Sequence, residues 1–260
     1  GGRRVLRSEE AARVKREIRE RIWRLLEEKS VAIFPKPVRG RIPNFKGHEV
    51  AAGRLLRHRV FTRARVVFVC PDSPQRPVRE AALRMGKILV MATPRLRSGF
   101  LVLDPKKIPP RFHRKASTIR GAFQLGELVD VPPFKIDVKV TGSVAVSPDG
   151  GRVGKGGGYS DLEYAILREL GLINDSTPVV TTVHDLQVVE RIPMTKHDMP
   201  VDYIFTPTRT IETNTSYPKP RGIVWEELDP RKMSEIPILH KIAIERGASS
   251  WRYRSRSLRS

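Results

Sequence analysis

The sequence predicts an α/β fold with a doubly wound, mostly parallel sheet, and two observations lead to it. Short apolar runs rich in β-branched residues alternate along the chain with segments whose apolar residues recur at helical spacing. The 260 residues, 39% of them hydrophobic and 21 of them proline, are enough for a sizeable core and many turns. An alternation of this kind places strands side by side, with helices on both faces of the sheet.

The chain opens with a predicted helix. Ser8 is in position to cap it, and Glu9 and Glu10 in its first turn would suit the helix dipole. Lys15 and Arg19 stand four residues apart and therefore project together from one side of the helix, where two cations are usually a solvated face. The apolar face is predicted to be Val14, Ile18, Ile22, Leu25 and Leu26.

Short strands and helices alternate after this helix. Strands are expected at residues 31–34, 66–70, 88–91, 138–146, 179–183 and 203–206, and helices at residues 48–58, 76–85 and 162–170. Parallel sheets place ligands at the carboxyl ends of their strands, so the loops that follow these strands are candidates for binding.

Two loops rich in proline and arginine, residues 35–45 and 93–99, follow the first and third predicted strands. For any single arginine in such a loop, solubility is the better explanation. Four arginines on two loops at one sheet edge favour capture of an anion instead. The four are Arg39, Arg41, Arg95 and Arg97.

Residues 152–161, with the sequence RVGKGGGYSD, are the most informative segment of the chain. A glycine-rich turn that leads from a strand into a helix N-terminus leaves backbone N–H groups free, and the helix dipole favours negative charge there. Lys155 adds a flexible positive charge. The simplest ligand is a phosphate, although the spacing is neither that of a Walker A loop nor that of a Rossmann turn, and a turn that needs positive φ is an equal alternative.

The net charge of +21 is uneven along the chain. Residues 1–150 carry 33 lysines and arginines against 14 acidic residues, whereas residues 151–250 carry 12 against 14. A surplus of this kind indicates anionic partners such as nucleic acid, a nucleotide or a polycarboxylate. Arginines outnumber lysines 34 to 15 and asparagine plus glutamine total six, a scarcity of amides that indicates a thermophilic source.

The single cysteine, Cys70, excludes an internal disulfide and fits a reducing compartment, where a buried structural thiol is expected. No apolar stretch approaches the ~20 residues that span a bilayer and no signal peptide is visible, so we expect a cytoplasmic protein without membrane contact. One domain is predicted over residues 1–245, followed by a basic Arg/Ser tail at residues 246–260 that can bind RNA. The sequence makes no prediction of the oligomeric state.

Four ordered blocks resemble the 5-formyltetrahydrofolate cyclo-ligase (methenyltetrahydrofolate synthetase) family. They correspond to the family's K-x-x-x-R helix, its R-x-G-x-G-x-G-Y-Y-D loop, its Q-x5-P-x3-H-D stretch and its D-x-I-x-T strand. The matching residues are Lys15, Arg19, Arg152, Gly154, Gly156, Gly158, Tyr159, Asp161, Gln187, Pro193, His197, Asp198, Asp202, Ile204 and Thr206. Within the family, residues 41–45, 93–97, 142–147, 161–165, 183–189 and 201–209 resemble the branch called methenyltetrahydrofolate synthetase domain-containing proteins.

The resemblance implies a three-layer α/β/α fold of the NagB/RpiA/CoA-transferase type. It also implies a ligase that uses ATP and Mg²⁺ to convert 5-formyltetrahydrofolate to 5,10-methenyltetrahydrofolate in one-carbon metabolism. In the family's scheme, ATP phosphorylates the formyl oxygen, N10 attacks the activated carbon and phosphate leaves.

The resemblance assigns the residues of the site as well. The glycine loop would supply N–H donors to ATP, Asp161 would hold Mg²⁺, and Lys155 and Asp161 would act in catalysis. The phosphates would be held by Lys15, Arg19, Arg152 and Lys155, with Gly154, Gly156, Gly157, Gly158 and Tyr159 around the nucleotide. The folate substrate would lie beside Phe45, Arg95, Arg97 and Tyr159.

The chain departs from the family at three places. Ser160 replaces a second tyrosine, and Leu162 stands where bacterial members often have arginine. Active enzymes also carry a glutamate in the loop after the first strand, whereas residues 36–41 contain no acid. Two functions therefore stay open: a cyclo-ligase, or a homologue that binds nucleotide or RNA through its basic N-terminal half.

Overall fold

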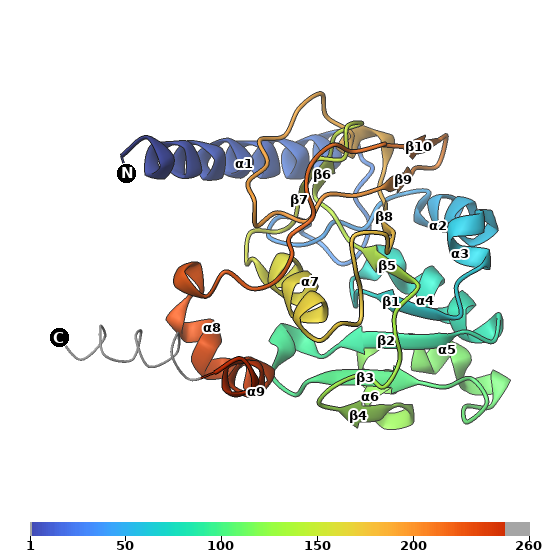
Figure 1. Ribbon diagram of the computed structural model, residues 1–260. Coiled ribbons are helices and arrows are strands. Elements are labelled where there is room, and N and C mark those ends of the chain that lie inside the picture. The colour runs from blue at the N-terminus through green and yellow to red at the C-terminus, as the bar shows by residue number, and fades with distance from the viewer. Residues whose placement is uncertain (1, 248–260) are drawn as a thin grey trace.

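The structure is a computed structural model that describes the backbone of residues 2–247 and the side chains of residues 8–247. The predicted basic tail lies outside the described residues from position 248 onward. Figure 1 shows a central sheet with helices on both faces and a long N-terminal helix across one end. The predicted three-layer α/β/α architecture with a mostly parallel sheet is confirmed.

The main sheet has eight strands in the order β10-β9-β8-β5-β1-β2-β3-β4. The strands from β9 to β2 in this order run parallel, whereas β10, β3 and β4 are antiparallel to their neighbours. Their bounds are β1 (Val66–Val69), β2 (Ile88–Ala92), β3 (Phe100–Leu103), β4 (Glu127–Val129), β5 (Val138–Thr141), β8 (Val179–Thr182), β9 (Tyr203–Phe205) and β10 (Thr210–Glu212). The strands predicted at residues 66–70, 88–91, 179–183 and 203–206 are confirmed to within one residue at each end.

Successive residues of a strand point to opposite faces of the sheet. Apolar residues lie on both faces of the central strands, and helices therefore cover both. Val66 and Phe68 of β1 join one core cluster, and Val67 and Val69 join the other. The first cluster is covered by α7 (Tyr159–Glu169), α8 (Pro230–Glu235) and α9 (Pro237–Glu245). The second is covered by α2 (His48–Arg57), α3 (Arg59–Thr62), α4 (Arg76–Arg84), α5 (His113–Ala116) and α6 (Ile119–Leu125).

Five single turns of 3-10 helix lie between the strands and helices of the described residues. They are η1 (Ser73–Gln75), η2 (Pro94–Leu96), η3 (Pro110–Phe112), η4 (Asp185–Gln187) and η5 (Trp225–Glu227). The helices predicted at residues 48–58 and 76–85 are confirmed as α2 and α4, and the helix predicted at 162–170 begins three residues earlier, as α7. No helix within residues 2–247 combines the length and the apolar character needed to cross a bilayer.

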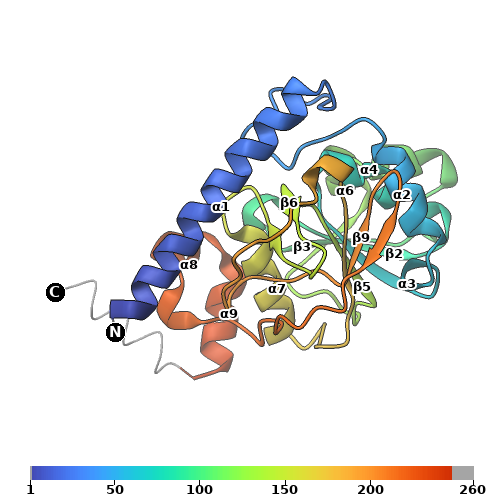
Figure 2. The ribbon, with the colours of Figure 1, turned by 90° about the horizontal axis from the view of Figure 1, so that it is seen from above.

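The N-terminal helix α1 (Gly2–Glu28) crosses the end of the sheet where the parallel strands finish (Figures 1 and 2). Its apolar face packs on a two-stranded antiparallel hairpin, β6 (Ala145–Val146) and β7 (Arg152–Val153). The prediction that Ser8 caps this helix is wrong, since α1 begins six residues earlier, at Gly2. Helical hydrogen bonds continue through Ser8, so its hydroxyl has no terminal N–H group to cap.

Two strand predictions are also wrong. Residues 31–34 form no strand of the sheet: Ala32 makes one isolated bridge to Phe45 and is buried against α1. The apolar stretch 138–146 is not one strand either, because it divides into β5 and β6 around Gly142. The glycine loop therefore follows the hairpin strand β7 and not a strand of the parallel sheet.

Candidate active site

The crevice of this sheet lies at the carboxyl ends of β1 and β5, where the strand order reverses. Asp72 follows β1, and Gly142 follows β5. A Cβ atom on Gly142 would lie only 2.8 Å from Oδ2 of Asp72 and 3.0 Å from Oε1 of Gln75, so a larger residue would displace these side chains. Gln75 donates from Nε2 to Oγ1 of Thr182 at the end of β8 (2.9 Å). The ends of β1, β5 and β8 thus meet beside the Asp72 carboxylate.

Asp72 corrects the expectation that the loop after the first strand lacks an acid. Because residues 31–34 lie outside the sheet, β1 is its first strand, and the loop after it reads Cys70-Pro71-Asp72. Arg79, which is nearly buried, fixes this loop by donating to the backbone oxygens of Cys70 (2.7 Å) and Asp72 (2.8 Å). The signal was present in the sequence, since a buried β-branched run ends just before this acid.

The glycine loop, residues 154–158, leaves β7 and enters α7. Gly156 (φ 109°) and Gly158 (φ 73°) adopt the left-handed conformation that favours glycine. Gly158 is the N-cap of α7, and no side chain caps the helix there. Lys155 is exposed with the three glycines that follow it. The first-turn N–H groups of α7 and the Lys155 ammonium are thus open to an anion.

The α1 cations reach this loop from the other end of the sequence. The Nε atom of Arg19 donates to the Gly154 carbonyl oxygen (2.7 Å), which lies 135 residues away along the chain. Lys15, which is buried, forms an ion pair with Asp198. Lys15 and Arg19, one helical turn apart, thus contact two different family blocks, the one with Asp198 and the one with Gly154. They are therefore not simply a solvated face of α1.

Arg152 lies beneath the loop, with only 3% of its surface exposed. It donates from Nη2 (2.7 Å) and Nε (3.2 Å) to the Gly142 carbonyl oxygen, and its Nη1 atom lies 3.8 Å from Oδ1 of Asp161. Burial and the neighbouring positive charge of Arg152 lower the pKa of Arg19. Arg152 therefore connects the crevice at Gly142 to Asp161 at the start of α7. The positive charges of Arg19 and Arg152 lie close together, and a bound anion would relieve their repulsion.

Two carboxylates stand beside these cations. Asp161 accepts a hydrogen bond from the Met199 N–H group (2.9 Å), and Asp198 accepts from the N–H (2.8 Å) and hydroxyl (3.1 Å) of Thr195. Burial raises the pKa of Asp161 and the negative charge of Asp198 adds to the rise, while Arg152 opposes it. Asp161, on α7, is thereby bonded to residue 199, next to the Asp198 carboxylate.

A buried ion pair below the crevice was missed at the sequence level. Lys139, in the middle of β5, is fully buried, with Nζ 3.0 Å from Oε1 of Glu163 on α7 and 5.2 Å from the centre of the Phe68 ring. Burial raises the pKa of Glu163, against the attraction of Lys139. The sequence does hold a signal for this ion pair, a lysine between two valines of an apolar strand. Lysine is almost never buried without a partner, so an acidic partner could have been expected.

The residues predicted to lie beside folate differ in their exposure. Phe45 is fully buried, with its ring centre 6.0 Å from that of His184 and 6.4 Å from that of His48. Arg95 and Arg97 are exposed around η2, which follows β2 at the edge of the crevice.

The predicted aim of the arginines in the loop at residues 35–45 is wrong. Arg39 bonds to Glu20 of α1 (2.9 Å), and Arg41 donates to the Pro37 carbonyl oxygen (3.1 Å). Arg39 is thus directed to α1 and Arg41 to its own loop, since this loop follows no strand of the sheet.

The two His-Asp pairs serve the backbone or other side chains. The Nδ1 atom of His184 accepts from the Leu186 N–H group (3.0 Å) and caps η4, and burial lowers the pKa of His184. His197 forms an ion pair with Glu227. Cys70 is buried and free, and burial raises its pKa, which confirms the predicted structural thiol.

No group of three or more His, Cys, Asp and Glu side chains within the described residues is placed to hold a metal ion. The carboxylates of Asp161 and Asp198 nevertheless suit Mg²⁺, which usually takes one or two protein carboxylates together with substrate phosphates. The described hydrogen bonds use Oδ1 of Asp161 and Oδ2 of Asp198, and so involve only one oxygen of each residue. The donor chemistry therefore fits a magnesium ion that arrives with a nucleotide.

Residues 11–207 match the 5-formyltetrahydrofolate cyclo-ligase family. The methenyltetrahydrofolate synthase domain-containing proteins of Mus musculus and Homo sapiens are 44% and 43% identical to this chain over 88% of its length, covering 63% and 61% of their own. The chain thus spans a little over three-fifths of these relatives. The 5-formyltetrahydrofolate cyclo-ligase of Escherichia coli K12 is 32% identical over 39% of this chain and 56% of that protein.

Two solved structures are similar at lower identity. The 5,10-methenyltetrahydrofolate synthetase of Aquifex aeolicus is 20% identical with a TM-score of 0.49, over 78% of this chain and 94% of that one. The enzyme of the same name from Mycoplasma pneumoniae is 12% identical with a TM-score of 0.43, over 74% of this chain and 98% of that one.

Proposed function

Because this chain belongs to the 5-formyltetrahydrofolate cyclo-ligase family, we propose that it converts 5-formyltetrahydrofolate to 5,10-methenyltetrahydrofolate with ATP and Mg²⁺. One observation carries the proposal. The family blocks, up to 183 residues apart in the sequence, meet at one end of the sheet through the Lys15–Asp198 and Arg19–Gly154 contacts. Cations, free backbone N–H groups and carboxylates are combined there, as phosphoryl transfer requires.

The phosphates of ATP would lie on the glycine loop. The N–H groups at the start of α7 and the Lys155 ammonium would bind phosphate oxygens, and the helix dipole would favour their charge. Arg19 stands over the loop and would neutralise charge directly. Arg152 is buried and holds the Gly142 carbonyl oxygen, so it would position the loop and Asp161 rather than contact a phosphate.

Asp161 and Asp198 would hold Mg²⁺ through their remaining oxygens, and the ion would supply charge neutralisation at the transferred phosphoryl group. Lys15 keeps Asp198 in place through its ion pair, and Thr195 orients the same carboxylate with two hydrogen bonds. These contacts fix the acid before any ligand arrives.

The folate substrate would occupy the crevice beside Asp72. A carboxylate there accepts hydrogen bonds from the N–H donors of a pterin-like ring, the role that the resemblance gives to the acid after the first strand. Gly142, which has no Cβ atom, lets the Asp72 and Gln75 side chains approach the end of β5 closely. Phe45 is fully buried, so it would support the wall of the crevice. Beyond Asp72 a groove lined by Phe34, Asn44, His48, Ser73, Arg76 and Arg114 opens between α2, α4 and α5. Its exposed arginines would attract the carboxylates of the folate tail.

The chemistry would then proceed by positioned phosphoryl transfer. The formyl oxygen takes the γ-phosphoryl group of ATP and ADP leaves; N10 attacks the activated carbon, loses its proton, and phosphate departs with the former formyl oxygen. The loop N–H groups would position the phosphoryl group, and the cations would stabilise the transferred charge.

The reaction is tested by absorbance at the methenyltetrahydrofolate band. Purified protein is mixed with 5-formyltetrahydrofolate and Mg²⁺, with and without ATP, at moderate and elevated temperature. An ATP-dependent rise is expected. Absence of the rise in a protein that still binds ATP would reject the reaction and retain only a nucleotide site.

The loop assignment has its own test. Lys155→Ala should weaken ATP binding, because an exposed ammonium beside phosphates contributes a charge-assisted contact. Lys46→Ala, which removes another exposed lysine, is the matched control. An unchanged ATP affinity in Lys155→Ala would exclude this lysine from the site.

RNA binding is the second candidate function. The observation that favours it is the same groove, where Phe34 is 83% exposed beside the exposed Arg76 and Arg114. An exposed ring next to cations can stack a single-stranded base. Affinity for single-stranded RNA should then fall steeply with salt, and a flat salt dependence would eliminate this function.

A further inference from the structure

The segment at residues 208–247 lies beyond the part of the chain that matches the family, which ends at residue 207. After β10 it runs along the molecule without regular structure, and then forms η5, α8 and α9. Figure 2 shows α8 and α9 beside α7, on the side where α1 passes. None of the four family blocks and none of the predicted site residues lies in this segment.

The segment is fixed firmly against α7. Leu228, Ile236 and Leu239 are buried in the same core cluster as Tyr164 of α7. Glu169, at the end of α7, accepts a hydrogen bond from the Ile223 N–H group (2.8 Å) and pairs with Arg246. With this apolar anchor and these polar contacts, the position of α8 relative to α7 is set by the core and not by the site.

From this position Lys232 of α8 reaches the glycine loop. Its Nζ atom donates to the Gly157 carbonyl oxygen at 2.6 Å and lies 4.9 Å from the centre of the Tyr159 ring. A Cβ atom on Gly158 would lie 3.0 Å from the same Nζ. The ammonium group is thus in contact with the loop at the point where α7 begins.

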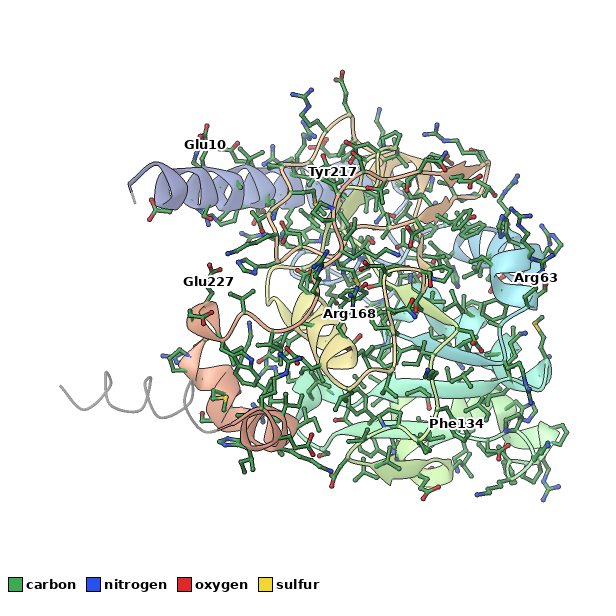
Figure 3. The ribbon with its side chains drawn as sticks, viewed as in Figure 1. Glu10, Arg63, Phe134, Arg168, Tyr217 and Glu227 are labelled. Atoms are coloured by element: carbon green, nitrogen blue, oxygen red, sulfur yellow. The ribbon has the colours of Figure 1, made fainter. Side chains whose placement is uncertain are left out.

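The segment touches a second family block as well. Glu227 of η5 pairs with His197 and lies 3.6 Å from Lys196, next to the Asp198 that binds Lys15 of α1. In Figure 3 the Glu227 side chain projects from the C-terminal segment on the side facing α1. One segment therefore holds both the glycine loop and the loop that carries Asp198.

A lysine at this place acts on the loop in two ways. Gly156 and Gly158 give the loop backbone freedom that must be lost when it binds a phosphate, and the bond to the Gly157 carbonyl removes part of that freedom beforehand. The ammonium also adds positive charge beside N–H groups that await an anion. Contact with the Tyr159 ring keeps the charge in place.

We propose that residues 208–247 complete the nucleotide site, with Lys232 as a positioning residue that holds the glycine loop ready for the phosphates of ATP. The inference rests on the proposed function, since it concerns the same loop. It adds a residue and a segment that the family match does not contain.

The test compares three variants with the wild type. Lys232→Met removes the charge and the hydrogen bond but keeps the apolar stem, whereas Lys232→Arg keeps the charge and a donor. Arg231→Met is the control, because it removes one exposed cation from the neighbouring position of the same helix. Calorimetry measures the Kd of ATP, steady-state kinetics measure kcat and the KM of each substrate, and thermal unfolding checks the fold.

Lys232→Met is expected to raise the Kd and KM of ATP about tenfold, the equivalent of one charged hydrogen bond, while the KM of the folate substrate stays unchanged. Lys232→Arg should recover most of the affinity, and Arg231→Met should bind like the wild type. If Lys232→Met does not fold, Lys232→Leu provides the same comparison, because leucine also lacks both the charge and a donor.

Wild-type ATP affinity in Lys232→Met, or an equal loss in Arg231→Met, would overturn the inference and leave the proposed function intact. A wild-type protein that binds no ATP would overturn both.

Discussion

The buried ion pair between Lys139 and Glu163 makes a stability prediction whose size follows from the structure. The two side chains are 0% and 10% exposed, and Nζ lies 3.0 Å from Oε1. Glu163→Gln would leave an unpaired lysine in the core, which can escape its charge only by losing a proton. Deprotonating a lysine of ordinary pKa, about 10.4, at pH 7 takes roughly 4.6 kcal/mol, at 1.36 kcal/mol per pKa unit. The loss of unfolding free energy in Glu163→Gln therefore cannot exceed roughly this value.

Lys139→Met leaves the acid instead, which escapes its charge by taking up a proton. The limit is then roughly 3.7 kcal/mol, from an ordinary glutamate pKa of about 4.3. Glu163→Gln should therefore be the more damaging change, and removal of both charges in Lys139→Met/Glu163→Leu should cost less than either, because no charge stays buried.

Urea unfolding at pH 7 of the wild type and the three variants measures these differences, and thermal melts should show them as falls of at most roughly 9–18 °C and 7–15 °C for the single variants. Costs below about 1 kcal/mol for both single variants, or a double variant as unstable as their sum, would refute the assignment of this pair as a mutually compensating buried contact.

Three further predictions concern the site. Arg19→Ala should raise the Kd of ATP about tenfold in calorimetry, since it removes a loop hydrogen bond and a cation, whereas Arg16→Ala on the exposed side of α1 should not. Asp72→Asn should lower kcat/KM for the folate substrate roughly 10- to 100-fold with ATP affinity unchanged; a matched loss of ATP affinity would contradict its placement on the folate side. Burial lowers the pKa of His184 below its usual 6.5, so the unfolded chain binds more protons and the unfolding free energy should decrease as pH falls through about 6.5. His184→Asn keeps a cap acceptor and should flatten part of that decrease in pH-dependent melts; an identical profile would refute it.

The central strands were predictable because their residues are buried on both faces and mostly β-branched, as in β1 and β8. The hairpin below the glycine loop was not found, although the sequence Ser147-Pro148-Asp149-Gly150-Gly151 is a strong turn signal. A run of apolar residues on both sides of Gly142 concealed it. The segment at 31–34 misled for a related reason: it is apolar because it packs on α1, and periodicity does not say which partner an apolar run has.

The residues of the candidate site were also predictable only in part. Spacing placed Lys15 and Arg19 on one side of α1, but only the resemblance connected them with the glycine loop, because contacts across 135 and 183 residues leave no local trace. Arg39 and Arg41 were assigned to the crevice from a strand that does not exist. Lys232 was missed because it belongs to no motif, and its contact depends on the docking of α8.

The chain separation within the site has a consequence for its order of assembly. During synthesis α1 emerges before the glycine loop, which follows more than a hundred residues later, and Asp198 and Lys232 come later still. The ribosome would therefore carry a chain whose sheet strands β1, β2 and β5 can already pair while Lys15 has no acid to bind. Closing such distant contacts is slow compared with local folding. The contacts of the proposed nucleotide site would thus be complete only after residues 198 and 232 have been synthesised, and ATP binding would appear no earlier than that.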